Sequence, residues 1–332
     1  MTARITIDPV AGLPEIVEGD DLAGLIAGLA HLRDGDVVVV AQKVVSKAEG
    51  ALVRTSPSEA SADARRRLAR EYARRVVADV PWALIVETQH GFVCANAGID
   101  ASNAVDGTLL LLPEDPDASA RRLRDGLSAL AGVDVAVVIT DTFGRPWRRG
   151  QTDVAIGVAG LAPLRDERGS LDRGGVALEV TEVAVGDEVA AAADLVRRKA
   201  DGAAVVVVRG LEWQADPAAA ARQLVRGAGE DLFPRGRGML ASALADPQPP
   251  SAEAEPLDPD DLAVARSAAA AAGAKLEESR GGAPTRLLVF GDRLAGGTVV
   301  AALLDLGCSA TWRDDPEHGL VVEAGREPVR RR

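Results

Sequence analysis

The chain has little of several things that mark common protein classes. Its 332 residues include only two cysteines, Cys94 and Cys308, so no disulfide framework is expected. The start "MTARITIDPV" lacks the basic and apolar regions of a secretory signal, and no apolar run is long enough to span a bilayer. These absences predict a cytoplasmic protein without a membrane segment.

Positive charge is also scarce. Lysine and arginine together number 38 against 50 aspartates and glutamates, which gives a formal net charge of −12. A phosphate backbone or an anionic membrane binds preferentially to a basic protein surface, so we expect neither a nucleic acid nor a membrane as partner. Any phosphate that binds here is expected to belong to a small molecule and to be held by a few local residues.

The familiar catalytic and nucleotide motifs are missing too. The sequence contains neither the G-x-x-x-x-G-K-[ST] loop nor the G-x-G-x-x-G dinucleotide fingerprint, so any nucleotide is bound by another device. His31, His90 and His318 are scattered, and no Cys/His cluster offers a zinc site. There is no G-x-S-x-G elbow, and Cys94 lies in an apolar stretch. Covalent serine or cysteine catalysis is therefore not predicted.

What is present describes a globular chain, 47% hydrophobic and 27% charged, with room for two domains. Strand-like runs alternate with helical segments, such as "ASADARRRLAREYARRVVAD", from Ile5 to about Val154, and a further strand, helix and strand follow up to about Leu244. Nearer the carboxyl terminus, "LAVARSAAAAAGAKLEE" is predicted to be a helix that runs through Glu278. A Pro- and acid-rich stretch reads as an exposed linker. We predict a main region over 1–244, a linker over 245–261 and a small α/β appendage over 262–332.

Four segments at predicted strand ends are unusual in composition. They are "GLPEI" at Gly12 to Ile16, "AQKVVSKAEG" with Gln42, Lys43, Ser46 and Lys47, "NAGIDASNAVDG" at Asn96 to Gly107, and "VVITDTFGRPWRRGQTD" at Val137 to Asp153. Loops at the carboxyl ends of strands can face a common crevice without disturbing the core. We therefore expect these segments to meet at one site.

The fourth segment predicts a loop that holds something charged, because it places a Gly, a Pro, a Trp and three Arg after a buried strand. Lys47, Arg145, Arg148 and Arg149 could neutralise a polyphosphate or an acidic substrate, with Arg suited to bidentate contact. The alternative is a solvated face whose arginines pair with the abundant carboxylates. Trp147 is equally compatible with a partly buried loop anchor.

Two aspartates form the acidic counterpart. Asp100 is followed by Ser102 and Asn103, and Asp141 by Thr142. Carboxylates with neutral oxygens are what a hard divalent ion such as Mg²⁺ or Mn²⁺ requires, with phosphate oxygens and water completing its shell. The alternative is that both aspartates are turn or cap residues that bond their own backbone.

In this order and at these separations, the four segments resemble the coenzyme F420-0:L-glutamate ligase family, and "VTEVAVGDEVAAAADLV" and "VVVVRGL" extend the resemblance over about Ile5 to Leu240. The resemblance implies an α+β fold with a mixed sheet, in an intertwined homodimer. It also implies GTP as the energy source and divalent Mn²⁺ or Mg²⁺, with K⁺ as a further candidate ion.

The resemblance also implies roles for individual residues. Asp100, Asp141 and Thr142 would be ligands of the metal ions. Lys199 is the one residue assigned in "LVRRKADG", because Arg197 and Arg198 replace a Met and a Gly that are frequent in relatives. Residue 42 is often Ser in relatives, so Gln42 departs from the pattern while keeping a hydrogen-bonding group. The implied GTP contacts are Leu13, Pro14, Glu15, Ile16, Gln42, Lys47 and Asn103.

The implied activity is the addition of L-glutamate to coenzyme F420-0 through an acyl phosphate formed from GTP, which needs no side-chain nucleophile. Our hypothesis is that Arg145 and Arg148 contact the anionic deazaflavin substrate or the transferring phosphate. A metal-dependent phosphotransferase or phosphohydrolase would use the same aspartates, and a non-catalytic scaffold would explain only the Ala-rich helices. The appendage is too short for the flavin domain fused to some relatives, so no flavin-dependent activity is predicted.

Overall fold

A computed structural model describes most of the amino-terminal two thirds of the chain and parts of the remainder. The described residues are 4–55, 61–80, 82–101, 107–170, 173–177, 181–197, 203–227, 230–231, 250, 254, 256–257, 259–279, 285–290, 299–304, 308–315 and 319–325. Two compact units are formed, one by residues 1–73 and 86–227 and the other by residues 74–85 and 228–332.

Short strands and helices alternate through the first two thirds of the chain. In order they are β1 (Thr6–Pro9), α1 (Leu22–Leu29), β2 (Val37–Ala41), α2 (Gln42–Ala48), β3 (Leu52–Arg54), α3 (Ser61–Glu71), β4 (Ala73–Val80), β5 (Ala83–Thr88), β6 (Val93–Ala95), η1 (Asn96–Gly98), β7 (Thr108–Leu110), α4 (Pro116–Ala131), β8 (Ala136–Arg145), β9 (Arg148–Leu161), β10 (Arg165–Asp166), β11 (Glu182–Val183), α5 (Val185–Asp194), β12 (Val205–Arg209), β13 (Ala215–Asp216) and η2 (Ala221–Leu224).

A six-stranded sheet forms the centre of the first unit, in the order β1-β12-β2-β8-β9-β13. Only β2 and β8 run parallel, and the other neighbours are antiparallel. The predicted mixed sheet in an α+β fold is therefore confirmed. The central strands β2 and β12 are nearly continuous runs of valine, and Val37 to Val40 are fully buried, as expected of strands covered on both faces.

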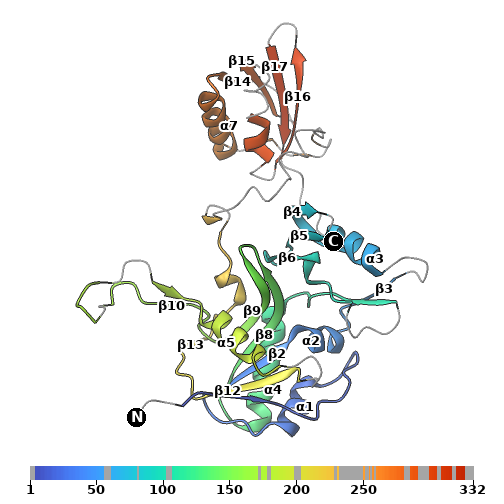
Figure 1. Cartoon of the computed structure of the whole chain (residues 1–332), viewed down its shortest axis with the longest axis vertical. Coiled ribbons are helices and arrows are strands. Elements are labelled where there is room, and N and C mark those ends of the chain that lie inside the picture. Colours follow the sequence, from blue (N-terminus) through green and yellow to red (C-terminus); the bar gives the residue numbers. More distant parts are fainter. Residues whose placement is uncertain are drawn as a thin grey trace. The chain divides into compact units, whose positions relative to one another are not determined.

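Helices α4 and α5 both pack against β9, and α1 packs against α4 (Figure 1). Helix α4 is delimited by standard signals, with Asp115 as N-cap, Pro116 in the first turn and Gly132 in the left-handed conformation (φ 69°) after its end. No helix in the described part of the chain is both long and apolar enough to cross a membrane.

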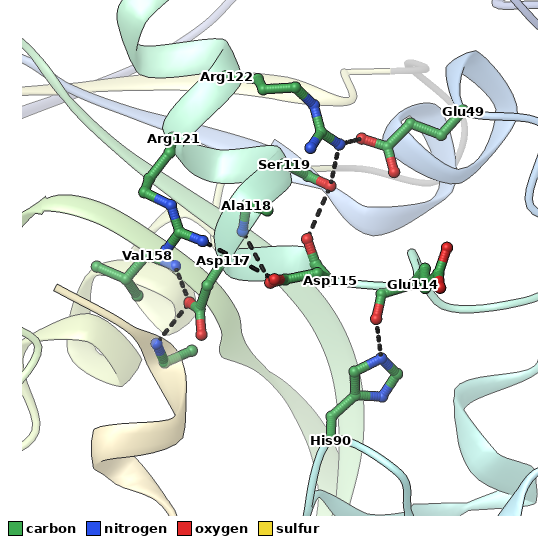
Figure 2. Close-up of polar contacts among 11 residues, drawn as sticks. Glu49, His90, Glu114, Asp115, Asp117, Ala118, Ser119, Arg121, Arg122 and Val158 are labelled. Atoms are coloured by element: carbon green, nitrogen blue, oxygen red, sulfur yellow. Dashed lines mark hydrogen bonds and ion pairs between the residues drawn. The ribbon is translucent and has the colours of Figure 1, made fainter. Parts of the chain in front are cut away.

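Polar contacts fix the start of α4 (Figure 2). The Asp115 carboxylate accepts a hydrogen bond from the Ala118 N–H at 2.8 Å. Arg122 donates to the Glu49 carboxylate at 2.6 Å and to the Ser119 hydroxyl at 3.0 Å. Because Glu49 directly follows α2, this contact ties α4 to the helix that leaves the central sheet at β2.

A second group of contacts at the same end involves backbone partners (Figure 2). The buried Asp117 accepts hydrogen bonds from the Val158 N–H of β9 at 2.9 Å and from the Ala221 N–H at 2.7 Å. The His90 Nε2 lies 3.1 Å from the Glu114 carbonyl oxygen, which requires that nitrogen to donate. The start of α4 is thus fixed by hydrogen bonds with Val158, Ala221 and His90.

The stretch from Val137 to Asp153 is a hairpin, so the prediction of a loop there is wrong. Strands β8 and β9 remain paired from Val137↔Ala159 out to Arg145↔Arg148, which leaves only Pro146 and Trp147 for the turn. Gly and Pro suggested a loop, but cross-strand hydrogen bonds continue through Gly144, with bulges beside Ile139 and Gly144. The arginines therefore stand at the tip of a long twisted pair of strands (Figure 1).

Two other local expectations differ from the structure. Gln42 to Ala48 form the helix α2 directly after β2, where a loop was predicted. Residues 73–80 form β4 in a three-stranded sheet with β5 and β6, although the sequence predicts one helix through this stretch. The helix stops after Glu71, because pairing with β5 favours the β-branched Val76 and Val77 as strand residues.

The second unit contains a four-stranded antiparallel sheet in the order β14 (Lys275–Ser279), β15 (Thr285–Phe290), β17 (Gly319–Gly325) and β16 (Ser309–Asp315). Helix α7 (Pro259–Ala271) packs near β14, and residues 299–304 form another helix. The predicted helix through Glu278 is wrong, because Gly273 (φ 72°) ends α7 and the chain continues as β14. Most of the predicted linker 245–261 lies outside the described residues, and the domain boundaries stay predictions.

Gly157→Ala is expected to destabilise the first unit by about 1–3 kcal/mol, the usual range for overpacking a core. A Cβ on Gly157 would overlap the backbone carbonyl of Pro116, which cannot move without shifting the start of α4. Gly28→Ala is the control, because a Cβ there meets nothing within 4 Å and alanine favours helix α1. Urea unfolding measures both. Equal stabilities for the two variants would contradict this account of the α4 contact.

Candidate functional site

The site begins where β2 ends beside the middle of β8. These parallel strands are in register, with Ala41 opposite Thr140, so α2 begins next to the part of β8 that carries Asp141. The chain after β2 turns at once into α2, while β8 continues with Asp141 and Thr142. The start of α2 lies near Asp141, since the positive charge of Lys43 lowers the pKa of the Asp141 carboxyl.

Helix α2 presents two lysines one turn apart, while its other face is buried. Val44 and Val45 belong to the hydrophobic core. Lys43 and Lys47 are four residues apart and therefore lie on one face of the helix. The Lys43 Nζ is 3.7 Å from a carboxylate oxygen of Asp100, and the Lys47 Nζ is 2.5 Å from a carboxylate oxygen of Glu15. One helical face thus links two of the predicted segments.

A left-handed turn brings Asp100 to this place. Asn96, Ala97 and Gly98 have φ angles of 51°, 56° and 69°, a conformation that costs energy for residues with a side chain. Glycine is favoured at position 98, because a Cβ there would collide with the Leu112 side chain. After the turn, the Asp100 backbone pairs with Leu110 in an isolated bridge. The strained segment positions the carboxylate.

Asp141 carries the strongest electrostatic signal of the site. Its pKa is raised from 3.8 to about 7, mainly by burial and also by the negative charges of Asp153 and Asp100, while the N–H of Thr142 and the charge of Lys43 lower it. The negative charges of Asp100, Asp141 and Asp153 are therefore only partly neutralised by neighbouring cations. This excess of negative charge is what a bound cation would balance.

Cys94 lies close enough to Asp141 to interact electrostatically with its carboxylate. Burial and this neighbouring carboxylate raise the pKa of the Cys94 thiol to about 12, so it stays protonated at neutral pH. A protonated thiol is a poor nucleophile.

Asp153 and Arg197 form a buried pair that the sequence analysis did not assign to the site. The Asp153 carboxylate accepts hydrogen bonds from the hydroxyls of Thr140 at 2.8 Å and Thr142 at 2.7 Å. Arg197 Nη1 donates to the same carboxylate at 2.7 Å. The missed signal is the hairpin itself, because antiparallel pairing places Asp153 opposite Thr142. Asp153 therefore orients the hydroxyl of the predicted metal ligand Thr142.

The predicted nucleotide contacts lie in different settings. Ile16 is buried in the core, Leu13 is partly buried against it, and Pro14 and Glu15 are exposed. Gln42 is buried, and its Nε2 donates to the Ser46 hydroxyl at 2.6 Å and to the Leu111 carbonyl oxygen at 2.8 Å. The amide nitrogen of Gln42 thus fastens α2 to the chain after β7.

Arg145 and Arg148 are not brought to the carboxylates within this chain. Arg145 and Arg148 lie at the hairpin tip, four or more residues beyond Asp141, which is about 13 Å or more along a strand. Arg145 donates to the backbone carbonyl of Arg149 at 2.5 Å. Asn103 and Lys199 lie outside the described residues, and their predicted nucleotide contacts stay predictions.

The donor set suits a hard divalent cation in kind. Asp100, Asp141 and Thr142 offer carboxylate and hydroxyl oxygens, the ligands that Mg²⁺ and Mn²⁺ prefer. Among the described residues, no three His, Cys, Asp or Glu side chains are close enough to form a complete protein cage. Such a cation would need oxygens from a bound phosphate or from water, as is usual for Mg²⁺ with nucleotides.

Asp141→Asn is expected to remove a pH dependence of stability in metal-free protein. Between pH 3.8 and about 7, folded Asp141 holds a proton that the unfolded chain has released, so wild-type stability falls as the pH rises through this range. The Asn variant should match the wild type near the lower end and be more stable at about pH 8, by about 1.4 kcal/mol per pKa unit. Urea unfolding with a chelator tests this, and a difference independent of pH would contradict it.

Comparisons with known proteins agree with this arrangement. The family model for F420-0:Gamma-glutamyl ligase matches residues 12–210. The Coenzyme F420:L-glutamate ligase of Methanopyrus kandleri is 44% identical over 245 residues, which is 69% of this chain and 97% of the relative. The proteins of that name from Archaeoglobus fulgidus and Halobacterium salinarum are 46% and 49% identical, over 63% and 61% of this chain and 88% and 86% of theirs. This chain belongs to the F420-0:γ-glutamyl ligase family.

Proposed function

We propose that this protein is a GTP-dependent ligase that adds L-glutamate to coenzyme F420-0 in the biosynthesis of coenzyme F420. The observation that carries the proposal is the convergence of Lys43, Lys47, Asp100 and Asp141 at one edge of the sheet, within the part of the chain that matches the family model. The names of the relatives supply the substrates, and the geometry supplies the means of handling phosphate and carboxylate groups.

The chemical problem is a poor leaving group. A carboxylate does not condense with an amine in water, so its oxygen first takes the γ-phosphoryl group of GTP, which gives an acyl phosphate and GDP. The glutamate amine then attacks the acyl carbon, the carbon–oxygen bond to phosphate breaks, and phosphate leaves as the amide forms. Catalysis of both steps rests on positioning and electrostatics, which agrees with a site whose buried thiol is protonated.

Lys47 is suited to the nucleotide side of this reaction. Its side chain is only 13% exposed, and its ammonium group contacts Glu15, which is 78% exposed. A buried point charge whose anionic partner can swing into solvent can exchange that partner for a phosphate oxygen. Leu13, Pro14, Glu15 and Ile16 would then line the nucleotide, with Gln42 shaping the segment behind them.

Asp100, Asp141 and Thr142 are suited to the metal side. A divalent ion held there would neutralise charge on the phosphate groups during transfer. The protein's own contribution is to hold the two carboxylates and the hydroxyl at one place, through the left-handed turn before Asp100 and the Asp153 hydrogen bond to Thr142. Lys43 lies beside Asp100 and limits its repulsion of Asp141.

The hairpin tip fits a role across a homodimer. Arg145, Arg148 and Trp147 are exposed there, and within one chain they are remote from the carboxylates. In the intertwined dimer that the family resemblance implies, this tip would reach the site of the partner subunit. Arg145 and Arg148 would then contact the anionic deazaflavin or the transferring phosphate, as hypothesised from the sequence.

A metal-dependent phosphotransferase or phosphohydrolase that acts on another small anionic substrate is the second candidate. The same carboxylate cluster around Asp141 favours it, because phosphoryl transfer to water or to another acceptor needs the same parts. Turnover of GTP without glutamate would identify this activity. Failure to bind any nucleotide would favour the scaffold alternative.

The first test is a mass-spectrometric assay of the purified protein with GTP, Mn²⁺ or Mg²⁺, L-glutamate and coenzyme F420-0. The wild type should add one or more glutamyl units in a GTP-dependent manner, and Asp141→Asn should lose at least about 100-fold in rate, since it removes a charge from the metal side. Asp166→Asn is the matched control, because Asp166 is exposed on β10 and paired with Arg168. GTP hydrolysis without glutamylation by the wild type would favour the second candidate.

Arg148→Ala tests the hairpin tip. If Arg148 contacts a substrate or the transferring phosphate, the variant should raise a Michaelis constant or lower turnover by about 10-fold or more, the usual effect of losing one charge-assisted contact. Arg121→Ala is a control at a half-exposed arginine of α4 that pairs with Asp115. Unchanged Michaelis constants and turnover for Arg148→Ala would remove this residue from the mechanism.

A further inference from the structure

Arg197 is a buried cation beside the carboxylate cluster. It follows α5, and its side chain is only 9% exposed. Its Nη1 donates to the Thr140 hydroxyl at 2.5 Å and to the Asp153 carboxylate at 2.7 Å. Thr140 directly precedes the predicted metal ligands Asp141 and Thr142 on β8. The guanidinium therefore contacts β8 next to these ligands.

The other edge of this guanidinium has no hydrogen-bond partner. Nε and Nη2 of Arg197 are both shielded from solvent and unpaired in the structure. In an arginine these two nitrogens lie on the same side, so their N–H groups form a parallel fork that matches two oxygens of one carboxylate or phosphate group. A buried N–H without a partner costs about 1–3 kcal/mol, and more on a charged group. This unpaired Nε–Nη2 edge is therefore suited to bind an anionic ligand.

The pairing with Asp153 leaves this fork available. Only Nη1 is committed to Asp153 and Thr140, so the ion pair holds the guanidinium in place without using its bidentate edge. Asp153 itself is occupied by the two threonine hydroxyls as well as by Arg197. The fork is therefore a fixed and preorganised group, in surroundings of low dielectric where a charged hydrogen bond is strong.

We propose that the Nε–Nη2 edge of Arg197 binds an oxyanion of the reacting substrates. The oxyanion is either the terminal phosphate of GTP or the carboxylate that receives it, and this choice rests on the function proposed above. Because Nε and Nη2 are both shielded from solvent, binding of the oxyanion requires the groups that cover this edge to move aside. The family resemblance implies no role for Arg197, since relatives often carry a methionine at this point of the chain.

Binding titrations with the full-length protein test this directly. Arg197→Met removes the charge while keeping an unbranched side chain, and Arg197→Lys keeps the charge but loses the fork. Calorimetry would measure the Kd of GTP, of GDP and of coenzyme F420-0, each with Mg²⁺. Arg122→Met is the matched control, because Arg122 is 63% exposed and pairs with Glu49 away from the carboxylates. Circular dichroism would confirm that each variant is folded.

The ligand that weakens identifies the oxyanion. A loss of about 10- to 100-fold for GTP but not for GDP, the usual worth of a charged hydrogen bond, assigns the terminal phosphate. A comparable loss for F420-0 alone assigns the carboxylate. In either case Arg197→Lys should recover only part of the affinity. Equal Kd values for the wild type and Arg197→Met with both GTP and F420-0, or equal losses for GTP, GDP and F420-0, would overturn the proposal.

A double variant separates direct contact from an effect through Asp153. Arg197→Met alone leaves the Asp153 carboxylate without its cation, whereas Arg197→Met with Asp153→Asn removes both charges and keeps a side chain of the same shape, whose oxygen can accept from one of the two threonine hydroxyls. If Arg197 contacts the ligand, the double variant stays weak; full recovery would show that Arg197 only neutralises Asp153 and would overturn the proposal. Weakened GTP binding in Arg197→Met together with a wild type that adds no glutamate would refute the ligase and leave this inference standing.

Discussion

The parallel pairing of β2 with β8 is the constraint on which the rest of the site depends. It places the end of β2 beside Thr140 and Asp141 of β8, with Ala41 opposite Thr140, although about 100 residues separate the two strands in the chain. All other neighbours in the central sheet are antiparallel. Had β2 been antiparallel to β8, α2 would begin near Ala136 instead of near Asp141, and the lysines could not balance the carboxylates.

The site is held by opposing charges whose balance is incomplete. Asp100 and Asp153 each repel Asp141, while Lys43 and Arg197 offset only part of this negative charge. Buried charge of this kind is costly for folding, and the fold sustains it through the left-handed turn at Asn96 to Gly98 and the tight approach of α4 to β9. Strain and excess charge both point to a site shaped for ligands.

The sequence could predict the chemistry better than the backbone. Asp100 and Asp141 stood out because each joins a strand-like run to oxygen-bearing neighbours, and the structure brings both beside Lys43. The hairpin was missed because Gly, Pro and Arg resemble a loop, whereas its strands are decided by pairing between Thr142 and Asp153. Arg197 could not be found at all, since its burial depends on contacts with residues 44 and 57 positions away.

The ion pair between Glu15 and Lys47 has a consequence for selectivity. Glu15 belongs to the same chain as Lys47, so it competes with any incoming anion as a tethered group, at an effective concentration on the order of millimolar. A ligand with a single charge and few other contacts gains little by displacing it. A polyphosphate that also engages the carboxylate side through a cation gains at both ends. The resting contact is therefore a filter that favours multivalent anions over the monovalent anions of the surrounding solution.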